Sequence, residues 1–408
     1  MMKKILVITW FYPPVNSSEG LVTYKLLNNS KYEYDVFTQK NSASWSYGNK
    51  ETLENKDNVN SIFAKSNNLK DWKKEAIEYF KNNKDKYDIV MTRSMPPESH
   101  EVGLKIKKIK PSIKWIASFG DPIANNPYVN LSKKMDNTRL LIRIKRLPKN
   151  IARNLVRKCI TENPIQDKTI KYSDMIIFNS EEQKKYMLGN KYKDKNSIVL
   201  AHSYDEKLYP NKVKKYEDKI HITYIGHLDR IRTPRIFLEA IKELKNEDED
   251  LFKKLEVDFY GNLCSDDKLY IFDNYLYDIV KYKKQVSYLE SLKIMKETNF
   301  LLHIDANLSL VNNENIFFAA KLADYIGSGT PIISITMLDG ASANILRNIN
   351  ALVLTYSKSD IKNYLRKIVY NNYKFELNKE TSLEYSSKEV AKKFDNMVSS
   401  ELGVKNEN

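Results

Sequence analysis

A cluster of arginines in the second half of the sequence has the residue type and spacing of an anion site. The cluster follows the apolar run 220–225 and Gly226, and its three members fall within six residues: Arg230, Arg232 and Arg235. A guanidinium offers a planar fork of donors that matches the oxygens of a phosphate. Pro234 favours a helix start, so we expect the cluster between a strand and a helix. His227 is a further candidate for contacting the anion, and a solvated surface cluster is the alternative.

A second segment pairs a cation with a carboxylate one helical turn apart. Lys321 and Asp324 belong to a helical stretch that ends at Gly327, before the apolar run 331–335. A carboxylate can accept hydrogen bonds from the two vicinal hydroxyls of a ribose. The neighbouring ammonium can neutralise a phosphate. The segment therefore predicts a second contact with a phosphorylated, sugar-containing ligand.

The loop after the first apolar run, 5–10, contains Glu19 and Gly20 and leads into a helical stretch. Free backbone N–H groups at such a helix start can bind a phosphate or a sugar hydroxyl. The loop matches neither the GxGxxG pattern nor a Walker loop, which excludes the common dinucleotide and P-loop sites. For Gly20, an ordinary turn residue is the alternative.

Two more polar residues follow apolar runs of the first half. His100 comes after the run 88–92 and could face a second substrate, although capping of a helix start explains it as well. Asp121 follows the run 114–119 after one intervening residue, Gly120. The remaining histidines lack the spacing of metal ligands. The acidic run 247–250 is interpreted as solvated, so we expect no metal.

Short apolar runs separated by amphipathic stretches must position these residues. Continuous rather than alternating apolarity indicates strands buried on both faces, as in a parallel sheet covered by helices. The first half has such runs at 5–10, 34–38, 88–92, 114–119, 174–179 and 197–201. The second half has them at 220–225, 255–260, 285–288, 299–305, 331–335 and 351–354. This order predicts two doubly wound, Rossmann-like α/β domains facing a cleft, with ligands beyond the carboxyl ends of the strands.

The charged, aperiodic stretch 209–219 is the expected linker between these domains. It separates an N-terminal domain, 1–208, from a C-terminal domain, 220–385. The residues 386–408 continue as an amphipathic helix with an apolar side formed by Val390, Ala391, Phe394, Met397 and Val398. Packing of this helix back on the N-terminal domain is one expectation.

Taken in order, these segments resemble the glycosyltransferases of family 4, which have the GT-B fold. The resemblance covers nearly the whole chain and rests on 11–14 with Gly20, 115–122, 174–180, 224–232, 321–325 and 329–331. It implies retaining transfer of a sugar from a nucleotide-diphosphate sugar, with no cofactor or metal. By position it implies donor contacts from Gly20, Gly226, His227, Arg230, Arg235, Glu314, Asp324 and Tyr325. It assigns the reaction to Arg232, Lys321 and His100, and the acceptor side of the cleft to Glu19 and Asp121.

The sequence departs from the family's paired-glutamate motif. Asp324 stands where the second glutamate is usual, and its shorter carboxylate can still bind a ribose. The first glutamate is expected eight positions earlier, where the chain has Ile316; Glu314 could replace it if the loop shifts. Arg235 stands where a lysine is usual. A catalytically silent scaffold and a nucleotide-sugar epimerase of the same fold are therefore alternatives to the transferase.

The amino-acid composition indicates which kind of partner the protein binds and in which cell compartment it functions. The 408 residues are 42% hydrophobic, enough for two cores and too apolar for a disordered chain. The net charge of +15 predicts an anionic partner. The two cysteines, Cys159 and Cys264, exclude a disulfide scaffold and a cysteine-rich zinc site, and favour the cytoplasm. No run approaches the roughly 18 apolar residues of a membrane span.

The stretch 131–160 is strongly basic, with ten Lys or Arg residues and a single acid, Asp136. Apolar residues are interspersed, which suits a surface lying on anionic lipid, with Arg139, Arg143 and Arg146 among its cations. A solvated helix face is the alternative. An RNA-binding face is a third interpretation, and the absence of interspersed aromatic residues argues against it. We expect peripheral attachment to the inner face of the plasma membrane, a lipid-linked or polysaccharide acceptor, and no nucleic acid.

Overall fold

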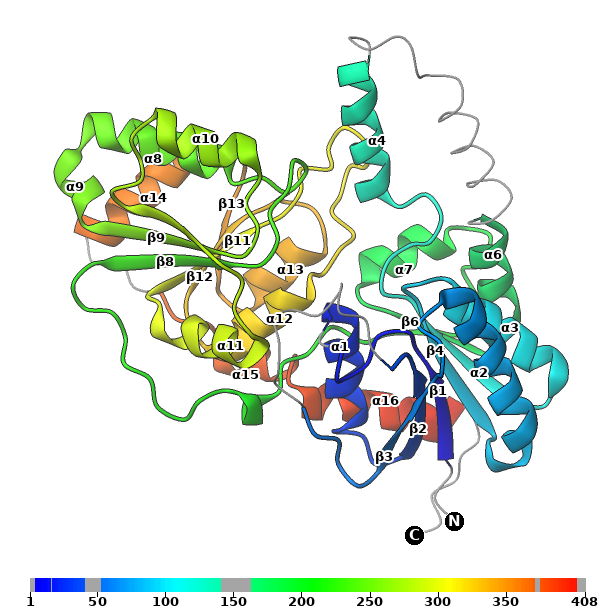
Figure 1. The fold of residues 1–408 in the computed structure, drawn as a ribbon. Helices are drawn as coiled ribbons and strands as arrows, with labels where there is room; N and C mark the ends of the chain where they lie inside the picture. Colours follow the sequence, from blue (N-terminus) through cyan, green and yellow to red (C-terminus); the bar gives the residue numbers. More distant parts are fainter. Residues whose placement is uncertain (1–3, 16, 41–52, 141–162, 371–374, 402–408) are drawn as a thin grey trace.

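A computed structural model describes residues 4–15, 17–40, 53–140, 163–370 and 375–401, which form two α/β domains with a parallel sheet each (Figure 1). The N-terminal sheet has seven strands in the order β3-β2-β1-β4-β5-β6-β7. The C-terminal sheet has six strands in the order β10-β9-β8-β11-β12-β13. The predicted fold class, two doubly wound Rossmann-like domains, is therefore confirmed.

The N-terminal sheet consists of β1 (Lys4–Ile8), β2 (Glu33–Thr38), β3 (Val59–Phe63), β4 (Ile89–Arg93), β5 (Lys114–Ser118), β6 (Met175–Phe178) and β7 (Ser197–Val199). Its helices are α1 (Ser18–Leu27), α2 (Leu69–Asn83), α3 (Glu98–Ile109), α4 (Pro127–Leu140), α6 (Asn163–Tyr172) and α7 (Glu181–Leu188). Side chains of α2, α3, α6 and α7 bury one face of this sheet. The other face packs on α1 and on a helix from the far end of the chain.

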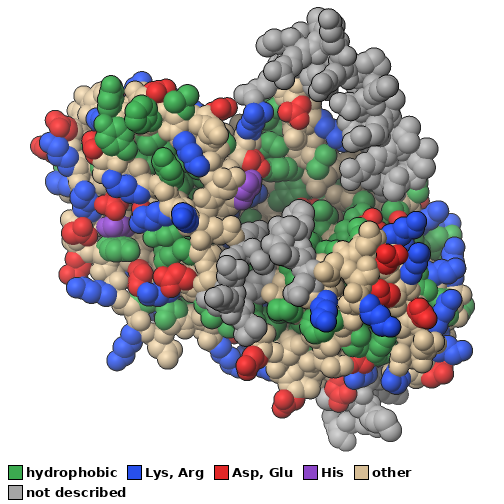
Figure 2. Space-filling model, viewed as in Figure 1, with side chains coloured by type: hydrophobic (Ala, Val, Ile, Leu, Met, Phe, Trp, Pro, Cys, Tyr) green, Lys and Arg blue, Asp and Glu red, His purple; other side chains and the backbone are tan. Residues whose placement is uncertain are grey.

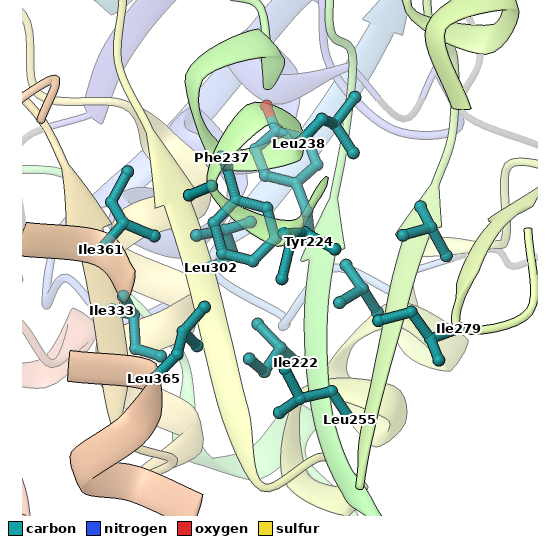
Figure 3. Close-up of a cluster of buried hydrophobic side chains, with 14 of the residues drawn as sticks. Ile222, Tyr224, Phe237, Leu238, Leu255, Ile279, Leu302, Ile333, Ile361 and Leu365 are labelled. Carbon is teal, nitrogen blue, oxygen red and sulfur yellow. The ribbon is translucent and has the colours of Figure 1, made fainter. Parts of the chain in front are cut away.

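The C-terminal sheet consists of β8 (Ile220–Ile225), β9 (Leu255–Tyr260), β10 (Val280–Lys283), β11 (Phe300–Ile304), β12 (Ile332–Ile335) and β13 (Leu352–Leu354). Its helices are α8 (Arg235–Glu247), α9 (Glu249–Lys253), α10 (Ser265–Asp273), α11 (Tyr288–Glu297), α12 (Ala320–Ser328), α13 (Ala341–Asn348), α14 (Lys358–Tyr370) and α15 (Lys379–Leu383). Phe237 of α8 and Leu365 of α14 pack on Tyr224 and Leu302 of the sheet (Figure 3). Helices α11, α12 and α13 cover the opposite face.

Both sheets have a switch point where the direction of winding reverses. In the N-terminal sheet the chain winds outward from β1 through β2 and β3, then returns to the other side of β1 with β4. In the C-terminal sheet β8 and β11 have the same relation. Loops separate at such a point and leave a crevice beyond the carboxyl ends of the strands. A ligand site is therefore expected after β1, β4, β8 and β11.

Helix α16 (Ser387–Glu401) lies against the N-terminal domain (Figure 1). Phe394 and Val398 share a buried cluster with Ile5 and Val7 of β1. The carboxylate of Asp395 accepts hydrogen bonds from Ser30 Oγ at 2.5 Å and from the backbone N–H of Lys31 at 2.9 Å. The chain thus passes between the domains twice.

The two crossings are hydrogen-bonded to each other. The N–H of Tyr204 donates to the carbonyl of Tyr385 at 3.0 Å, and the N–H of Ser387 donates to the carbonyl of Tyr204 at 2.7 Å. The ring of Tyr204 lies on Gly327 of α12, where an added Cβ would come within 2.3 Å of it. These contacts hold the two crossings together beneath the domain boundary.

Two strands differ from the sequence prediction. The run 285–288 was expected to be a strand, but the strand is β10, Val280–Lys283, and Tyr288 begins α11 after its cap Ser287. Strand β3, Val59–Phe63, was not predicted. Both β3 and β10 are edge strands with exposed polar residues, so neither has the continuous apolar run of a central strand.

Candidate active site

The loop after β8 has a shape fixed by backbone contacts. Gly226 has a φ of +130°, a value that favours glycine, and its N–H donates to the carbonyl of Tyr260 at 2.8 Å. The Oδ1 atom of Asp229 accepts the N–H groups of Ile231 and Arg232, each at 2.8 Å. This loop, residues 226–234, is called the arginine loop below.

Arg232 and Lys321 bring two cations together at the switch point of the C-terminal sheet. Lys321, on the first turn of α12, donates to the hydroxyl of Tyr224, and its Nζ lies 3.7 Å from the centre of that ring. The same Nζ would lie 3.5 Å from a Cβ added to Gly226, so it adjoins the arginine loop. Burial lowers the pKa of Lys321 well below its usual value, and the charge of Arg232 lowers it further. A bound anion would relieve this repulsion.

Asp305, directly after β11, is the carboxylate beneath these cations. It is 3% exposed, and its Oδ2 accepts Asn315 Nδ2 at 2.9 Å and Thr336 Oγ1 at 2.8 Å. Burial alone would raise the pKa of Asp305, but His303 and Arg232 hold it well below its usual range. Asp305 therefore stays ionised and offsets part of the positive charge of the site.

The N-terminal domain contributes a charged cluster from the start of α1, the end of β4 and the loop after β5. The Nε of Arg93 donates to Glu19 Oε2 at 2.8 Å, and its Nη1 donates to Ser118 Oγ at 3.0 Å. A Cβ added to Gly120 would come within 2.8 Å of the Glu19 carboxylate. The pKa of the neighbouring Asp121 is raised to about 6, mainly by burial and also by Glu19, while the charges of Arg232 and Arg93 act in the opposite direction. The ring of Tyr128, in the same domain as Asp121, lies 5.8 Å from the guanidinium carbon of Arg232, so the clusters of the two domains lie close to each other.

Two guanidinium nitrogens of these clusters are available for hydrogen bonds. Arg93 Nη2 and Arg232 Nε are buried, and neither has a hydrogen-bond partner within the described part of the chain. Buried donors without a partner are rare, because each costs about 1–3 kcal/mol of desolvation. One such donor in each domain is the arrangement expected for a ligand bound between them.

A cavity of about 590 Å³ lies between α4 and the arginine loop. Its lining includes Ser132, Met135 and Asp136 of α4, and His227 and Arg230, which are both exposed. The space-filling view shows the surface hollowed between the two domains beside α4 (Figure 2). His227 and Arg230 are thus accessible to a ligand, as the prediction of donor contacts requires.

His100 requires a correction. It is fully buried in α3, with its ring 4.6 Å from that of Phe119 and its Nδ1 2.7 Å from Thr92 Oγ1. Burial lowers its pKa to about 3, and the charge of Arg93 contributes. The side chain is therefore neutral and inside the N-terminal core, so the prediction that it faces the acceptor is wrong.

Arg235 also points elsewhere. Its Nε and Nη2 bind Asp267 Oδ1 at 2.9 and 2.8 Å, its Nη2 also donates to the carbonyl of Asp266, and the guanidinium lies over the ring of Tyr270. Asp267 is only 1% exposed, so this pair fixes α8 to α10. A donor contact from Arg235 is therefore not supported.

Asp324 faces the N-terminal domain. Its Oδ1 accepts Lys25 Nζ of α1 at 2.9 Å and the hydroxyl of Tyr288 at 3.0 Å. Lys25 is 1% and Asp324 6% exposed, so this is a buried ion pair between the domains. A ribose would have to share or displace these partners. The neighbouring Tyr325 is buried, and its hydroxyl accepts the N–H of Ile225, which makes it a support for β8.

Two further predicted donor contacts are Gly20 and Glu314, and Ile316 stands where the first glutamate was expected. Gly20 is in the first turn of α1, where an added Cβ would come within 2.9 Å of the Val15 carbonyl, so a larger residue does not fit. Ile316 is buried, and its carbonyl accepts Ser180 Oγ of the N-terminal domain at 2.9 Å. Glu314, two residues earlier, is half-buried, and its carbonyl accepts Asn312 Nδ2 at 2.7 Å.

The basic stretch is described only in part. Arg139 lies in α4 but its side chain is not described, and Arg143 and Arg146 lie outside the described residues. At its beginning, Leu131 is 3% exposed and packs on Ala306 and Leu308 of the C-terminal domain, so this residue does not belong to a membrane-facing surface. In the described ranges no helix is both long and apolar enough to cross a bilayer.

One set of possible metal ligands occurs away from the site. Ligand atoms of His221, Glu256 and Asp258 lie within 4.8 Å of one another. Lys283 Nζ is 2.8 Å from Asp258 Oδ2, so an ammonium already neutralises this carboxylate. The spacing of these residues in the sequence had not indicated the group, because they come from two adjacent strands.

Arg93, Asp229 and Asp305 were not predicted. Each is a single polar residue at or after the end of an apolar strand, and a single residue forms no motif. Their position at carboxyl ends of strands was the available signal, since ligands of α/β sheets bind there.

Neither a protein-family model nor a curated protein matches the sequence. Solved structures do match. Sucrose-phosphate synthase from Thermosynechococcus elongatus is 12% identical over 98% of this chain and 99% of its own, with a TM-score of 0.67. Anabaena HepE in complex with UDP and glucose is 12% identical over 98% and 99%, with a TM-score of 0.58. A putative UDP-N-acetylglucosamine 2-epimerase from Listeria monocytogenes is 10% identical over 99% and 97%, with a TM-score of 0.56. These likenesses confirm the GT-B fold and do not single out family 4.

Proposed function

We propose that the protein is a retaining glycosyltransferase that moves a sugar from a nucleotide-diphosphate sugar to an acceptor hydroxyl. The observation that carries this proposal is the geometry at the C-terminal switch point. Lys321 Nζ adjoins Gly226 of the arginine loop, and in the same loop the buried Arg232 Nε has no partner within the described residues and lies close to the N-terminal domain. A transferase of this fold has to bind a diphosphate on one domain and an acceptor against the other. The fold shared with HepE, which was solved with UDP and glucose, supports a nucleotide-sugar donor.

The two cations would act on the leaving group. As the bond from the sugar to the diphosphate breaks, negative charge grows on the diphosphate, and preorganised cations stabilise it without reorganisation. Arg232 offers an Nε without a partner in the described chain, and Lys321 lies on the first turn of α12, where the helix dipole is positive. These groups do the work that a divalent metal does elsewhere, so we expect no metal requirement.

The acceptor would lie against the N-terminal cluster. Glu19 and Asp121 present carboxylate oxygens, and Arg93 presents an Nη2 that has no partner among the described residues. This set of donors and acceptors suits sugar hydroxyls. We propose a lipid-linked or surface-polysaccharide acceptor at the inner face of the plasma membrane. The ten cations of the stretch 131–160 support that location.

The decisive experiment is transfer by the purified protein. It combines a panel of nucleotide-diphosphate sugars with lipid-linked and soluble acceptors, and follows released diphosphate and glycosylated product. Arg232→Ala and Lys321→Ala should each lower turnover on the order of a hundredfold, as expected for groups that stabilise transition-state charge. Arg366→Ala is the matched control, because Arg366 pairs with Glu247 on α8, on the far side of the domain.

The outcomes separate the alternatives. Interconversion of the donor sugar without an acceptor would indicate an epimerase, the activity named for the Listeria protein of this fold. Binding of the donor without any turnover would indicate a silent scaffold. For the membrane location, Arg139→Glu, Arg143→Glu and Arg146→Glu together should release the protein from anionic vesicles while donor binding persists. Equal binding to neutral and anionic vesicles would contradict it.

A further inference from the structure

The beginning of α4 is anchored firmly in the N-terminal domain. Asn126 caps the helix, because its Oδ1 accepts the N–H groups of Tyr128 at 2.9 Å and Val129 at 3.3 Å. The preceding Asn125 has a φ of +55°, and its carbonyl accepts the hydroxyl of Tyr186 of α7 at 2.6 Å. The first turn of α4 therefore has a fixed position relative to Asp121, which lies a few residues earlier.

From this anchor α4 reaches the C-terminal domain (Figure 1). Leu131 packs on Ala306 and Leu308, which follow β11. Lys134 Nζ donates to the carbonyl of Leu310 at 3.0 Å. Residues on consecutive turns of one helix thus touch the opposite domain at the mouth of the site.

Tyr128 is the residue of α4 that contacts the arginine loop itself. Its hydroxyl donates to Asp229 Oδ2 at 2.5 Å, and its ring lies 5.8 Å from the guanidinium carbon of Arg232. Asp229 uses its other oxygen, Oδ1, for the backbone N–H groups of Ile231 and Arg232. The side chain of Tyr128, from the N-terminal domain, therefore contacts both Asp229, whose carboxylate shapes the arginine loop, and Arg232, the cation of that loop.

We propose that Tyr128 is a positioning residue that fixes Arg232 for the diphosphate only while the two domains are together. When the domains separate, Asp229 loses the Tyr128 hydroxyl and Arg232 loses the ring, so the loop relaxes. Contact between the domains would in this way be required for a fully formed diphosphate site. The inference rests on the proposed function, because it assumes that Arg232 binds a diphosphate.

The test compares the affinity for a nucleoside diphosphate with that for the matching monophosphate. UDP and UMP, GDP and GMP, and ADP and AMP serve as calorimetric probes, and the pair with the tightest diphosphate is used. Tyr128→Phe keeps the ring and loses the hydroxyl, and Tyr128→Leu loses both. Lys134→Met is the control, since it removes a contact between α4 and the C-terminal domain that does not involve the loop.

The ratio of diphosphate to monophosphate affinity should fall about tenfold in Tyr128→Phe and further in Tyr128→Leu, the loss expected for a hydrogen bond to a charged group. In Lys134→Met the ratio should remain that of the unaltered protein. A purely structural role for Tyr128 would weaken both nucleotides alike and leave the ratio unchanged.

The results distinguish two failures. If the unaltered protein binds a diphosphate and the ratio is the same in both Tyr128 variants, the role of Tyr128 is refuted and the proposed function stands. If the unaltered protein binds none of the three diphosphates, the proposed function fails and the inference fails with it. A fall of equal size in Lys134→Met would also overturn the inference, because any contact of α4 would then suffice.

Discussion

The buried ion pair between Lys25 and Asp324 predicts a large loss of folding stability when either partner is replaced. The two charged atoms are 2.9 Å apart, and both residues are less than a tenth exposed. At an effective dielectric constant of about 20, this separation corresponds to a gross Coulomb attraction of roughly 6 kcal/mol. Most of this attraction is cancelled by the cost of removing both charges from water. Removing one partner leaves the other charge buried, so Lys25→Met should cost about 3–5 kcal/mol.

A double-mutant cycle measured by urea unfolding tests this reasoning. Asp324→Asn should also destabilise, because it strands the ammonium of Lys25. The double variant removes both charges and keeps an acceptor for Tyr288, so it should recover most of the loss. Lys253→Met, which breaks the exposed pair with Glu249, is the control and should have no measurable effect. Single variants as stable as the parent, or losses that add in the double variant, would refute the reasoning.

The same cycle examines the ribose assignment of Asp324. The double variant restores the domain boundary but lacks the carboxylate. If Asp324 binds the ribose, this variant should still lose roughly 1.5–3 kcal/mol of nucleotide affinity, the value of hydrogen bonds to a charged group. Normal nucleotide affinity in the double variant would mean that the carboxylate serves only the pair with Lys25.

Three further outcomes are expected. Lys321 must be protonated to hold a diphosphate, so the affinity for the diphosphate should be full at low pH and should fall as the pH rises through the pKa of Lys321, which is well below 10.5. Calorimetry at a series of pH values checks this. In Lys321→Met the affinity should be low and should not change with pH. Arg235→Met should change turnover by no more than about twofold. It should lower the melting temperature, because it leaves the buried carboxylate of Asp267 without its guanidinium partner. A loss of turnover like that of Arg232→Ala would contradict this. Burial raises the pKa of Asp121 from 3.8 to about 6, so its ionisation destabilises the fold increasingly between these two pH values and fully above them. Asp121→Asn should therefore stabilise the protein by about 1 kcal/mol near pH 8, allowing for partial exposure, and not at all near pH 3; thermal unfolding at both pH values checks this.

The sequence predicted the fold well where strands are buried on both faces. Runs such as Ile220–Ile225 and Leu255–Tyr260 lie in the middle of a sheet, and their continuous apolarity is a direct consequence of that place. At sheet edges one side of the strand meets solvent or only a loop, and the pattern weakens. The Lys- and Tyr-containing β10 was therefore assigned to the wrong residues, and β3 was missed.

Site residues could be predicted from the sequence only where a residue suited to binding stands next to residues that mark the end of a strand and the start of a helix. Arg232 follows a strand and precedes a proline-started helix, so its place at a ligand edge could be inferred. His100 also follows a strand, but the sequence does not reveal which side of α3 meets the core. The partner of Asp324 is Lys25, which lies 299 residues away in the sequence. A local sequence pattern cannot predict a contact between residues so far apart.

The return of α16 to the N-terminal domain has a consequence for biosynthesis. When a ribosome has made the first 219 residues, every strand of the N-terminal sheet is complete, yet the face bearing Ile5, Val7 and Tyr34 lacks the cover that α16 later provides. At about 5–20 residues per second, roughly 9–36 s pass before residues 387–401 have been synthesised. During that interval the nascent chain carries an apolar sheet face that α16 does not yet cover, although all strands of the second sheet have already been synthesised.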